Sequence, residues 1–516
     1  MRRARSETLV LAAFSLLLVV VAACRQEFIG DGVRHLQGAI ESDAPQFGAP
    51  RWLLFPALAW LLIHPLAALG VVTGIEPAIQ VILALCVLSG IAYVWGLDVW
   101  LRAEGCPPQA RAAALMMAGS TTPFLVLYSD IAEVQFPAAI VVLALAGCRA
   151  RFAPDRGGDG TVLVTVAAIA LAALLYQGLV LALLFIPLVA PLATLRRKNV
   201  LVAAAAIALL VPATMILSRL SAGDGVDTAG LTTFRGERGE LVRASLASPT
   251  PMKWAAALVA GPPQAVVGLW RFQGLPSIAR GVLAHDRDAV TNALRLAVGM
   301  GLVVLLGWGV VRTRDWRLVL ATLGVVALPV IRNQQYTYSK YYVLFPVVLA
   351  LASLKLRPKY VAMAAAVTLA LNSQLVARQV VEGRARSFDV QQAYRAATSD
   401  DCFFTSDWGA PFWHRWPGSS AALISILWAN DGATKDDRVT PALRDCFCRS
   451  GRVWTDTTAA ATDEVTRLTE YFGATAASVK EFLYRPGDGE AIAENGARIF
   501  EYSERRKDEL CAVAQR

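Results

Sequence analysis

Long apolar runs recur along this chain, and basic clusters separate them. Residues 9–23, 200–217 and 361–377 each approach the roughly 20 apolar residues that cross a bilayer as a helix. Hydrophobic residues make up 56% of the 516 residues, and the mean hydropathy of +0.48 exceeds that of an ordinary soluble domain. The pattern therefore predicts a mainly α-helical, polytopic membrane protein.

The basic clusters orient the predicted helices. A net charge of +9 would suggest nucleic acid in a soluble protein, but here the cations lie in short loops, which favour the cytoplasmic side. The six clusters are Arg2/Arg3/Arg5, Arg102/Arg111, Arg149/Arg151/Arg156, Arg196/Arg197/Lys198, Arg312/Arg314/Arg317 and Lys355/Arg357/Lys359. Placing all six inside requires a cytoplasmic N-terminus and an alternating path.

About eleven crossings satisfy that path. We expect them at residues 8–24, 78–101, 112–128, 133–148, 161–176, 179–195, 199–218, 292–311, 318–332, 341–355 and 360–377. Because eleven is odd, the C-terminal tail is expected outside. Two proline-containing apolar stretches, 52–70 and 254–270, do not fit this parity. We interpret them as bent, interfacial or re-entrant outer helices, whose freed backbone groups protein must cover.

The first apolar segment has two interpretations. Val21-Ala22-Ala23-Cys24 resembles a bacterial lipoprotein cleavage box, so residues 1–23 could be a removed signal. A retained anchor helix is favoured, because the rest of the chain is polytopic. Both interpretations place residues 25–50 outside.

The composition changes near residue 380, which predicts a membrane domain over 1–379 and an extracytoplasmic domain over 380–516. Residues 402–406 and 452–455 are typical of buried strands, and residues 419–428 and 461–472 of helices. Their alternation predicts a small α/β domain. Its cysteines, Cys402, Cys446, Cys448 and Cys511, favour one or two disulfides over a metal knuckle, with the pairing open.

The first outer loop, residues 25–50, is rich in ionisable groups. Asp31 lies between two glycines just where the first helix leaves the lipid. An aspartate in a turn or at a helix N-cap is the ordinary explanation. We nevertheless expect this region to contribute a functional acid and substrate-binding groups. The candidates are Asp31, Arg34, His35, Asp43 and Arg51.

Further polar groups are expected at the same face. Asp130 and Glu133 lie in an outer hairpin, three residues apart, so one helical turn would stack them. Acids at a membrane edge are functional candidates. The outer loop 332–342 carries two cations among tyrosines, and another tight outer turn follows residue 175. The candidates there are Arg332, Tyr336, Lys340, Tyr176 and Gln177.

This arrangement resembles the GT-C superfamily of membrane glycosyltransferases, which includes protein O-mannosyltransferases and aminoarabinose transferases. The resemblance covers nearly the whole chain as architecture. It rests on the early acid Asp31, the proline-containing stretch 51–65, the Asp130/Glu133 hairpin after Thr122-Pro123, and the outer tail. The tandem acidic pair that many members carry is absent, since Gly32 follows Asp31.

The resemblance implies an inverting enzyme that uses a polyprenyl-phosphate-linked sugar. Asp31 would be the general base toward an acceptor hydroxyl of an envelope glycan, lipid or protein. Asp130 and Glu133 would orient the acceptor, or bind a metal if one is used. Arg332 and Lys340 would compensate the phosphate charge, with a divalent metal as the alternative.

Two other functions stay open at this point. A transporter or flippase of lipid-linked sugars would need an internal repeat and mid-membrane acids, and neither is visible in the sequence. A non-catalytic scaffold would use the outer tail to bind a partner. The Ala-, Leu- and Arg-rich usage suggests a GC-rich bacterium, hence the inner membrane with a periplasmic tail.

Overall fold

This computed structural model describes most of the membrane domain and parts of the tail. The described residues are 5–25, 36, 39, 44–45, 54–73, 75–131, 133–152, 158–191, 194, 251–270, 275–331, 342–396, 398–405, 422–425, 447–448, 451–456, 489–491 and 499–514.

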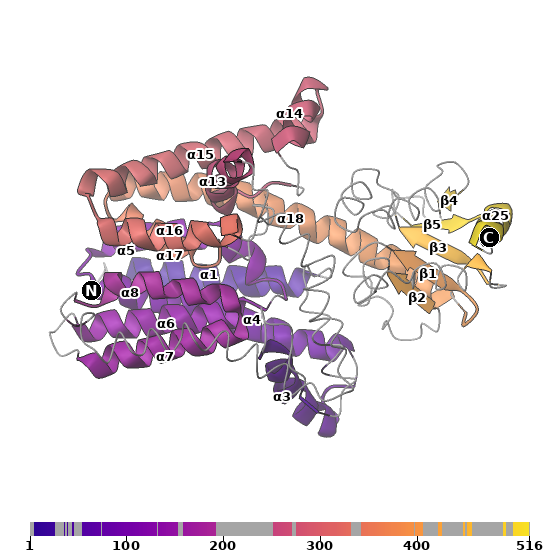
Figure 1. Ribbon diagram of the computed structural model, residues 1–516, viewed down its shortest axis with the longest axis horizontal. Coiled ribbons are helices and arrows are strands. Elements are labelled where there is room, and N and C mark those ends of the chain that lie inside the picture. The colour runs from indigo at the N-terminus through magenta and orange to yellow at the C-terminus, as the bar shows by residue number, and fades with distance from the viewer. Residues whose placement is uncertain are drawn as a thin grey trace.

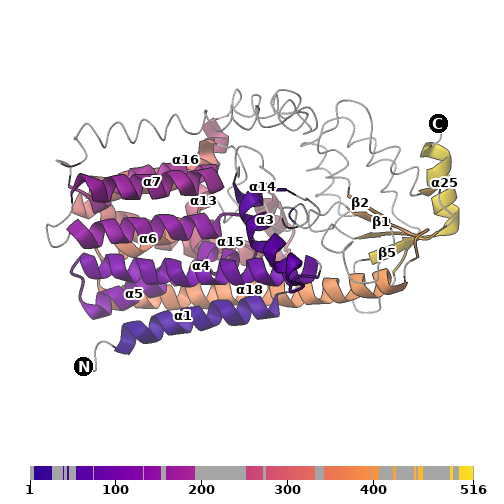
Figure 2. The ribbon, with the colours of Figure 1, turned by 90° about the horizontal axis from the view of Figure 1, so that it is seen from below.

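Helices that run along one common direction form the membrane domain (Figures 1 and 2). They are α1 (Arg5–Cys24), α4 (Ile75–Ala103), α5 (Pro108–Gly119), α6 (Gln135–Phe152), α7 (Asp159–Leu175), α8 (Ile186–Val189), α15 (Arg287–Thr313), α16 (Trp316–Ile331), α17 (Phe345–Ser353) and α18 (Pro358–Ala396). Within the described part of the chain, five of them (α1, α4, α6, α15 and α18) are long and apolar enough to cross a bilayer. The protein is therefore a multi-pass membrane protein.

One end of the bundle gathers those residues of the basic clusters that the structure describes. Arg111 at the start of α5 pairs with Glu7 of α1, and Lys355 pairs with Asp315 at 3.1 Å, which joins two turns between helices. The N-terminus lies at this end, whereas the tail domain lies beyond the other (Figure 1). We call the end on the tail side the outer end.

Helix α1 is an integral part of the bundle. Leu11, Phe14 and Leu18 are at most 5% exposed. A β-carbon on Gly119 of α5 would lie 2.7 Å from the Phe14 ring, and one on Gly90 of α4 would lie 2.8 Å from Leu18. Glycine at these two positions lets the helices approach closely, as small residues do between membrane helices.

The two stretches outside the predicted parity form α3 (Phe55–Ala68) and α13 (Pro251–Val266). At 1.5 Å per residue each is shorter than the roughly 30 Å hydrocarbon core. Helix α3 lies across the bundle direction at the outer end (Figures 1 and 2). Its preceding amide, Leu54 N, donates to Leu174 O of α7 at 3.1 Å.

Three predicted crossings depart from a continuous α-helix. The segment 112–128 changes after Gly119 into a π-helix, η3 (Pro123–Leu127). The segment 179–195 is mostly a 3₁₀-helix, η4 (Gln177–Phe185), followed by the short α8. In 341–355 the helix begins only at Phe345. The predicted crossing 199–218 lies outside the described residues.

Helix α18 continues from the bundle to a mixed sheet (Figure 1). The strands are β1 (Cys402–Thr405), β2 (Ala422–Ser425), β3 (Val453–Asp456), β4 (Gly489–Ala491) and β5 (Ile499–Tyr502), and α25 (Glu504–Ala514) follows. Their order is β2-β1-β3-β5-β4. Strand β1 pairs in parallel with β2 and β3, whereas β5 is antiparallel to β3 and β4.

The predicted helix over 419–428 is wrong, because its centre forms β2. A short apolar run cannot be assigned to helix or strand by periodicity alone, and pairing with β1 decides for strand. The predicted helix 461–472 lies outside the described residues. Cys448 forms a disulfide with Cys511 of α25, and Cys402 is also disulfide-bonded.

Candidate active site at the outer end of the bundle

The outer hairpin between α5 and α6 is built from an irregular helix end. Helix α5 stops at Gly119, and the π-helix η3 begins at Pro123, whose ring fits the first turn of a helix. Single π-turns inside membrane helices are rare and concentrate at functional sites. The chain then reaches Asp130 and Glu133 before α6 starts at Gln135.

Asp130 is held from two sides. Its carboxylate is 2% exposed and pairs with Arg25, whose Nη1 lies 3.2 Å from Oδ2. The Ile131 amide donates to Oδ1 at 2.6 Å. The other terminal nitrogen of Arg25, Nη2, donates to Ser129 Oγ at 3.3 Å. These bonds join the outer end of α1 to the hairpin.

Gln135 closes the hairpin from the α6 side. Its Nε2 donates to Leu127 O at 2.8 Å and to Asp130 O at 3.0 Å. The Leu127 carbonyl also accepts from the Asp130 amide at 2.8 Å, so Gln135 adds a second bond at the end of the π-helix. Gln135 is fully buried, so these bonds hold the hairpin against the start of α6.

Glu133 is fully buried, with 0% of its surface exposed. We expected one helical turn to stack it on Asp130, and this prediction is wrong. Both acids precede α6, and Glu133 lies in a turn. Pro137 in the first turn of α6 is the signal that could have shown this, since proline favours that position.

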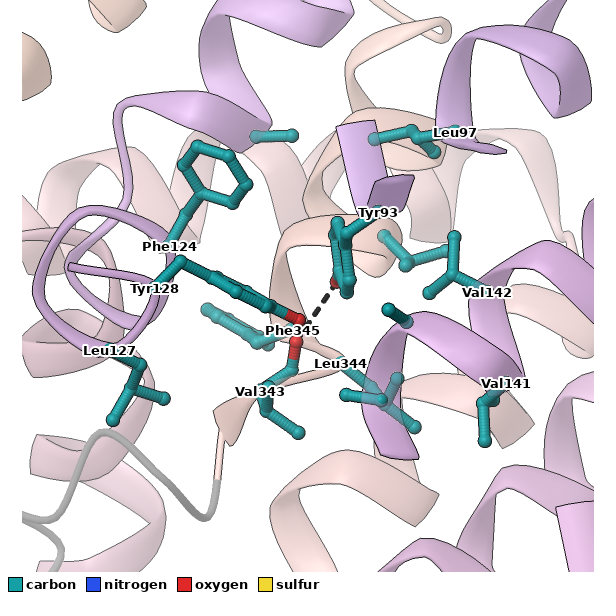
Figure 3. Close-up of a cluster of buried hydrophobic side chains, with 14 of the residues drawn as sticks. Tyr93, Leu97, Phe124, Leu127, Tyr128, Val141, Val142, Val343, Leu344 and Phe345 are labelled. Carbon is teal, nitrogen blue, oxygen red and sulfur yellow. Dashed lines mark hydrogen bonds between the residues drawn. The ribbon is translucent and has the colours of Figure 1, made fainter. Parts of the chain in front are cut away.

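An aromatic cluster supports the hairpin from below. Tyr93 of α4, Phe124 of η3 and Tyr128 lie with ring centroids 5.3–6.1 Å apart. Tyr93 Oη donates to Val343 O at 2.9 Å, and Figure 3 shows these side chains converging from separate helices. The cluster fixes the π-helix against α4 and against the turn before α17.

Tyr176 lies at the end of α7 and is 2% exposed. Its amide still bonds Ala172 O at 2.8 Å, and its own carbonyl accepts from Leu179 N at 3.0 Å. The tight turn predicted there is present. Gln177 opens η4, and its side chain lies outside the described residues.

The remaining predicted site residues also lie outside the described residues, so the structure does not place them. They are Asp31, Arg34, His35, Asp43, Arg51, Arg332, Tyr336 and Lys340. Among the residues that the structure does describe, no group of three or more His, Cys, Asp or Glu could hold a metal ion.

Asn372 of α18 is a site residue that sequence reasoning missed. It is fully buried, and its Nδ2 donates to Ser120 O and Val266 O, both at 2.8 Å. Its Oδ1 accepts from Gly268 N at 3.0 Å and from Thr122 Oγ1 at 3.4 Å. One side chain therefore forms hydrogen bonds with backbone groups at two helix ends, the end of α5 and the end of α13. An asparagine inside an apolar crossing was the available signal.

Arg295 of α15 was missed as well, although an arginine inside a predicted crossing is a strong signal. It is 2% exposed. Its Nε donates to Gly268 O at 2.6 Å and its Nη2 to Leu371 O at 2.9 Å. Asn292 accepts from the next free amide, Trp270 N, at 2.9 Å. Protein groups thus cover the non-helical backbone after α13, as a segment at membrane depth requires.

Trp270 closes this region toward the outer end. Arg378 lies over its ring at 4.4 Å from the centroid. The same guanidinium forms a two-pronged ion pair with Asp288, with both N–O distances 3.1 Å. Through these contacts Arg378 of α18 connects the loop after α13 with the start of α15.

No family model and no curated protein matches this sequence. The structure is similar to the crystal structure of ArnT from Cupriavidus metallidurans bound to undecaprenyl phosphate. The TM-score is 0.52 at 13% identity, over 96% of this chain and 97% of that one. It is also similar to the Archaeoglobus fulgidus oligosaccharyltransferase in complex with Zn and sulfate. There the TM-score is 0.45 at 11% identity, over 96% of this chain and 73% of that one.

The match to ArnT extends over both chains from the first helix to the tail domain. At 13% identity this match shows a shared fold and does not show a shared activity. In this chain the matched region contains a packed first helix, an irregular outer hairpin, a bundle, and a sheet domain at the outer end. This chain therefore has the fold of ArnT, which is the GT-C fold that the sequence resemblance implies.

Proposed function

We propose that this protein is a membrane glycosyltransferase that moves a sugar from a polyprenyl-phosphate donor to an envelope acceptor. The observation that carries the proposal is the end-to-end match of the fold to ArnT, a chain bound to undecaprenyl phosphate in its crystal structure. The buried acids of the outer hairpin support it, because they lie at the end opposite the basic clusters.

The reaction is proposed at the outer face of a bacterial inner membrane. The basic clusters gather at the end opposite the tail domain, which favours a cytoplasmic position for that end. The Cys448–Cys511 disulfide lies in the tail domain. Disulfides persist in oxidising compartments such as the periplasm. Both observations support a periplasmic tail domain over residues 380–516.

In the proposed chemistry, Asp31 accepts the proton of an acceptor hydroxyl while that oxygen attacks the anomeric carbon. The bond between this carbon and the phosphate oxygen breaks, and polyprenyl phosphate leaves from the opposite face with the electron pair. The configuration at the carbon is thereby inverted. Arg332 and Lys340 stabilise the charge on the leaving phosphate, a role that a divalent metal could also fill.

The other polar residues singled out in the sequence are proposed to bind the substrates. Seven residues are proposed to bind the donor or the acceptor: Arg34, His35, Asp43, Arg51, Tyr176, Gln177 and Tyr336. Glu133 and Asp130 belong to the hairpin that orients the acceptor. Partners are the lipid-linked sugar, a glycan, lipid or protein acceptor, and the bilayer.

One observation favours the second candidate, a transporter of lipid-linked sugars. The helix breaks at Ser120 and Gly268 face each other across Asn372, and apposed breaks are typical of transporter sites. Asn372 lies 14 residues from the first residue of α18, which is about 21 Å from the inner end. Because Asn372 is near the middle of the apolar span Pro358–Gly383, the two breaks are at the depth where transporter sites lie. The fold match to ArnT is what favours the enzyme.

The test is sugar transfer by purified protein in lipid vesicles with a panel of polyprenyl-phosphate sugars and an envelope extract as acceptor. Asp31→Asn should abolish transfer while the protein is still produced and inserted in the membrane. Glu41→Gln, an acid of the same loop without an assigned role, is the matched control and should keep activity. Transfer retained by Asp31→Asn would remove this residue as the base.

A further inference from the structure

Two turns at the end of the bundle opposite the tail domain are rich in cations. They are the turn between α15 and α16 and the turn between α17 and α18. Lys355 pairs with Asp315 at 3.1 Å, and this ion pair joins the two turns. Within the described residues the other cations of these turns form no ion pair: Arg312, Arg314, Arg317, Arg357 and Lys359. Positive charge therefore exceeds negative charge here.

The two turns form one surface, because α15 packs closely against the second of them. A β-carbon on Gly309 of α15 would lie 3.5 Å from the β-carbon of Lys355 and 3.4 Å from Leu356. This contact and the Lys355–Asp315 pair hold the end of α15 beside the start of α18. We call the five unpaired cations and the exposed rings next to them the inner basic surface.

Helix stability does not account for three of these cations. Arg317 and Lys359 lie in the first turns of α16 and α18, and neither first turn contains an acid. A cation is unfavourable there, since the amide end of a helix dipole is itself positive. Arg314 follows α15 in the left-handed region, with a φ of 51°, where glycine is the usual residue. These positions therefore need another explanation, and a bound anion supplies one.

Exposed aromatic rings accompany the cations. Trp316 is 50% exposed and Tyr360 is 49% exposed. The guanidinium of Arg317 lies 5.8 Å from the ring centre of Trp316, and the ammonium of Lys359 lies 4.9 Å from that of Tyr360. Tryptophan and tyrosine favour the level of the lipid headgroups. Exposed apolar side chains lie nearby on α15, α16 and α18: Trp308, Val311, Val319 and Met363. Positive charge beside apolar contacts fits a phospholipid better than a soluble anion.

We propose that the inner basic surface binds an anionic phospholipid as a retained partner. Its phosphate pairs with Arg314, Arg317 and Lys359, and its acyl chains lie against the exposed apolar side chains. Basic sites between membrane helices on the cytoplasmic side are known to bind anionic headgroups. The general preference for cations on that side does not require them to gather unpaired beside exposed rings at two joined turns. The inference is independent of the proposed sugar transfer.

The first measurement is native mass spectrometry of the purified protein, titrated in detergent with phosphatidylglycerol or with zwitterionic phosphatidylcholine. Phosphatidylglycerol should stay bound under conditions that remove phosphatidylcholine. Arg317→Gln should weaken its binding about fivefold, the factor that one basic residue near an anionic headgroup contributes. Equal retention of the two lipids by the unmodified protein would overturn the proposal.

The matched control is Arg151→Gln, which removes an exposed cation from the last turn of α6 at the same end of the bundle. It changes the net charge by the same amount and should weaken phosphatidylglycerol binding less than about twofold. Equal losses in Arg317→Gln and Arg151→Gln would mean that only the overall charge of this end matters, and the proposed site would be wrong.

The second measurement separates a lipid from a soluble anion and replaces the first if Arg317→Gln does not fold. Phosphatidylglycerol should raise the melting temperature in detergent, whereas glycerol phosphate at the same concentration, which lacks acyl chains, should not. Lys359→Gln should reduce the increase, and Lys359→Arg, which keeps the charge, should preserve it. An equal increase with glycerol phosphate, or an unchanged increase in Lys359→Gln, would contradict the proposal. Both measurements report lipid binding, so they decide the proposal whether or not the protein transfers sugar.

Discussion

The amide of Gly268 donates a 3.0 Å hydrogen bond to the side chain of Asn372. A β-carbon at Gly268 would lie 2.8 Å from Thr122 and 2.6 Å from Leu375. The backbone after α13 can therefore approach α18 only because residue 268 has no side chain. This contact joins the two helix breaks beneath the candidate site.

Asn372→Leu should strongly destabilise the protein. Leucine is of similar size but leaves Ser120 O, Val266 O and Gly268 N without partners in a buried place. Each unsatisfied buried group costs about 1–3 kcal/mol. Thermal unfolding in detergent should show the loss as a lowered melting temperature. Met363→Ala, at a side chain of the same helix that is 66% exposed, is the control and should change little.

The long crossings could be predicted from the sequence, as could the gathering of the described basic residues at one end of the bundle. The apolar runs of α1, α4, α15 and α18 have the length that a bilayer requires. The predicted inner clusters meet in ion pairs such as Lys355–Asp315. Both properties are local, because they depend on hydrophobicity and on charge in short loops.

The irregular elements could not be predicted in the same way. The π-helix at Pro123–Leu127 and the 3₁₀-helix at Gln177–Phe185 have the same apolar composition as α-helix. The strand Ala422–Ser425 owes its conformation to pairing with β1. In each case tertiary packing decides between conformations that the local sequence permits.

The candidate site was predicted in part. The sequence located Asp130 and Glu133 at an outer hairpin, but the partner of Asp130 is Arg25, 105 residues away. A cation directly after an apolar helix at the outer face breaks the positive-inside trend. The same signal marks Arg332 and Lys340 in the sequence, and it marks Arg25 equally. The roles of Asp31, Arg332 and Lys340 stay predictions.

Gly119→Ala should weaken the packing of α1. The added methyl group would lie 2.7 Å from the Phe14 ring, which is itself buried. Overpacking of this kind costs about 1–3 kcal/mol. Gly147→Ala is a matched control on α6, because nothing lies within 4 Å of its added carbon. Equal melting temperatures for the two variants would contradict the close approach of α1 and α5.

Stability of the tail domain should decrease at low pH through Asp401. Burial acts to raise the pKa of this carboxyl group, but the amides of Thr398 and Arg452 and the Arg452 guanidinium outweigh it. The pKa of Asp401 therefore lies below its usual 3.8. A depressed pKa in the folded state gives stability that is present above pH 3.8 and is lost as the pH falls through the folded-state value.

Hydrogen exchange of the described residues 398–405 and 451–456, measured as a function of pH, checks this expectation. Protection should fall as the pH drops below about 4, since the unfolded carboxyl then binds the proton more tightly. Asp401→Asn should be less protected at neutral pH and should show a weaker dependence on pH. The same pH dependence in Asp401→Asn would show that another group is responsible.

Removal of the Cys448–Cys511 disulfide should release α25 from the tail domain. The bond closes a segment with a sequence separation of 63, for which the chain-entropy model gives a stabilisation of about 4 kcal/mol. The paired variant Cys448→Ser/Cys511→Ser should therefore become sensitive to limited proteolysis near its C-terminus.

Cys106→Ser, at a free cysteine in the turn between α4 and α5, is the control and should keep the resistance of the unmodified protein. Because both cysteines belong to the tail domain, the melting temperature of the membrane domain should stay unchanged in the paired variant. A shift of that transition would mean instead that the tail domain contributes to the stability of the bundle.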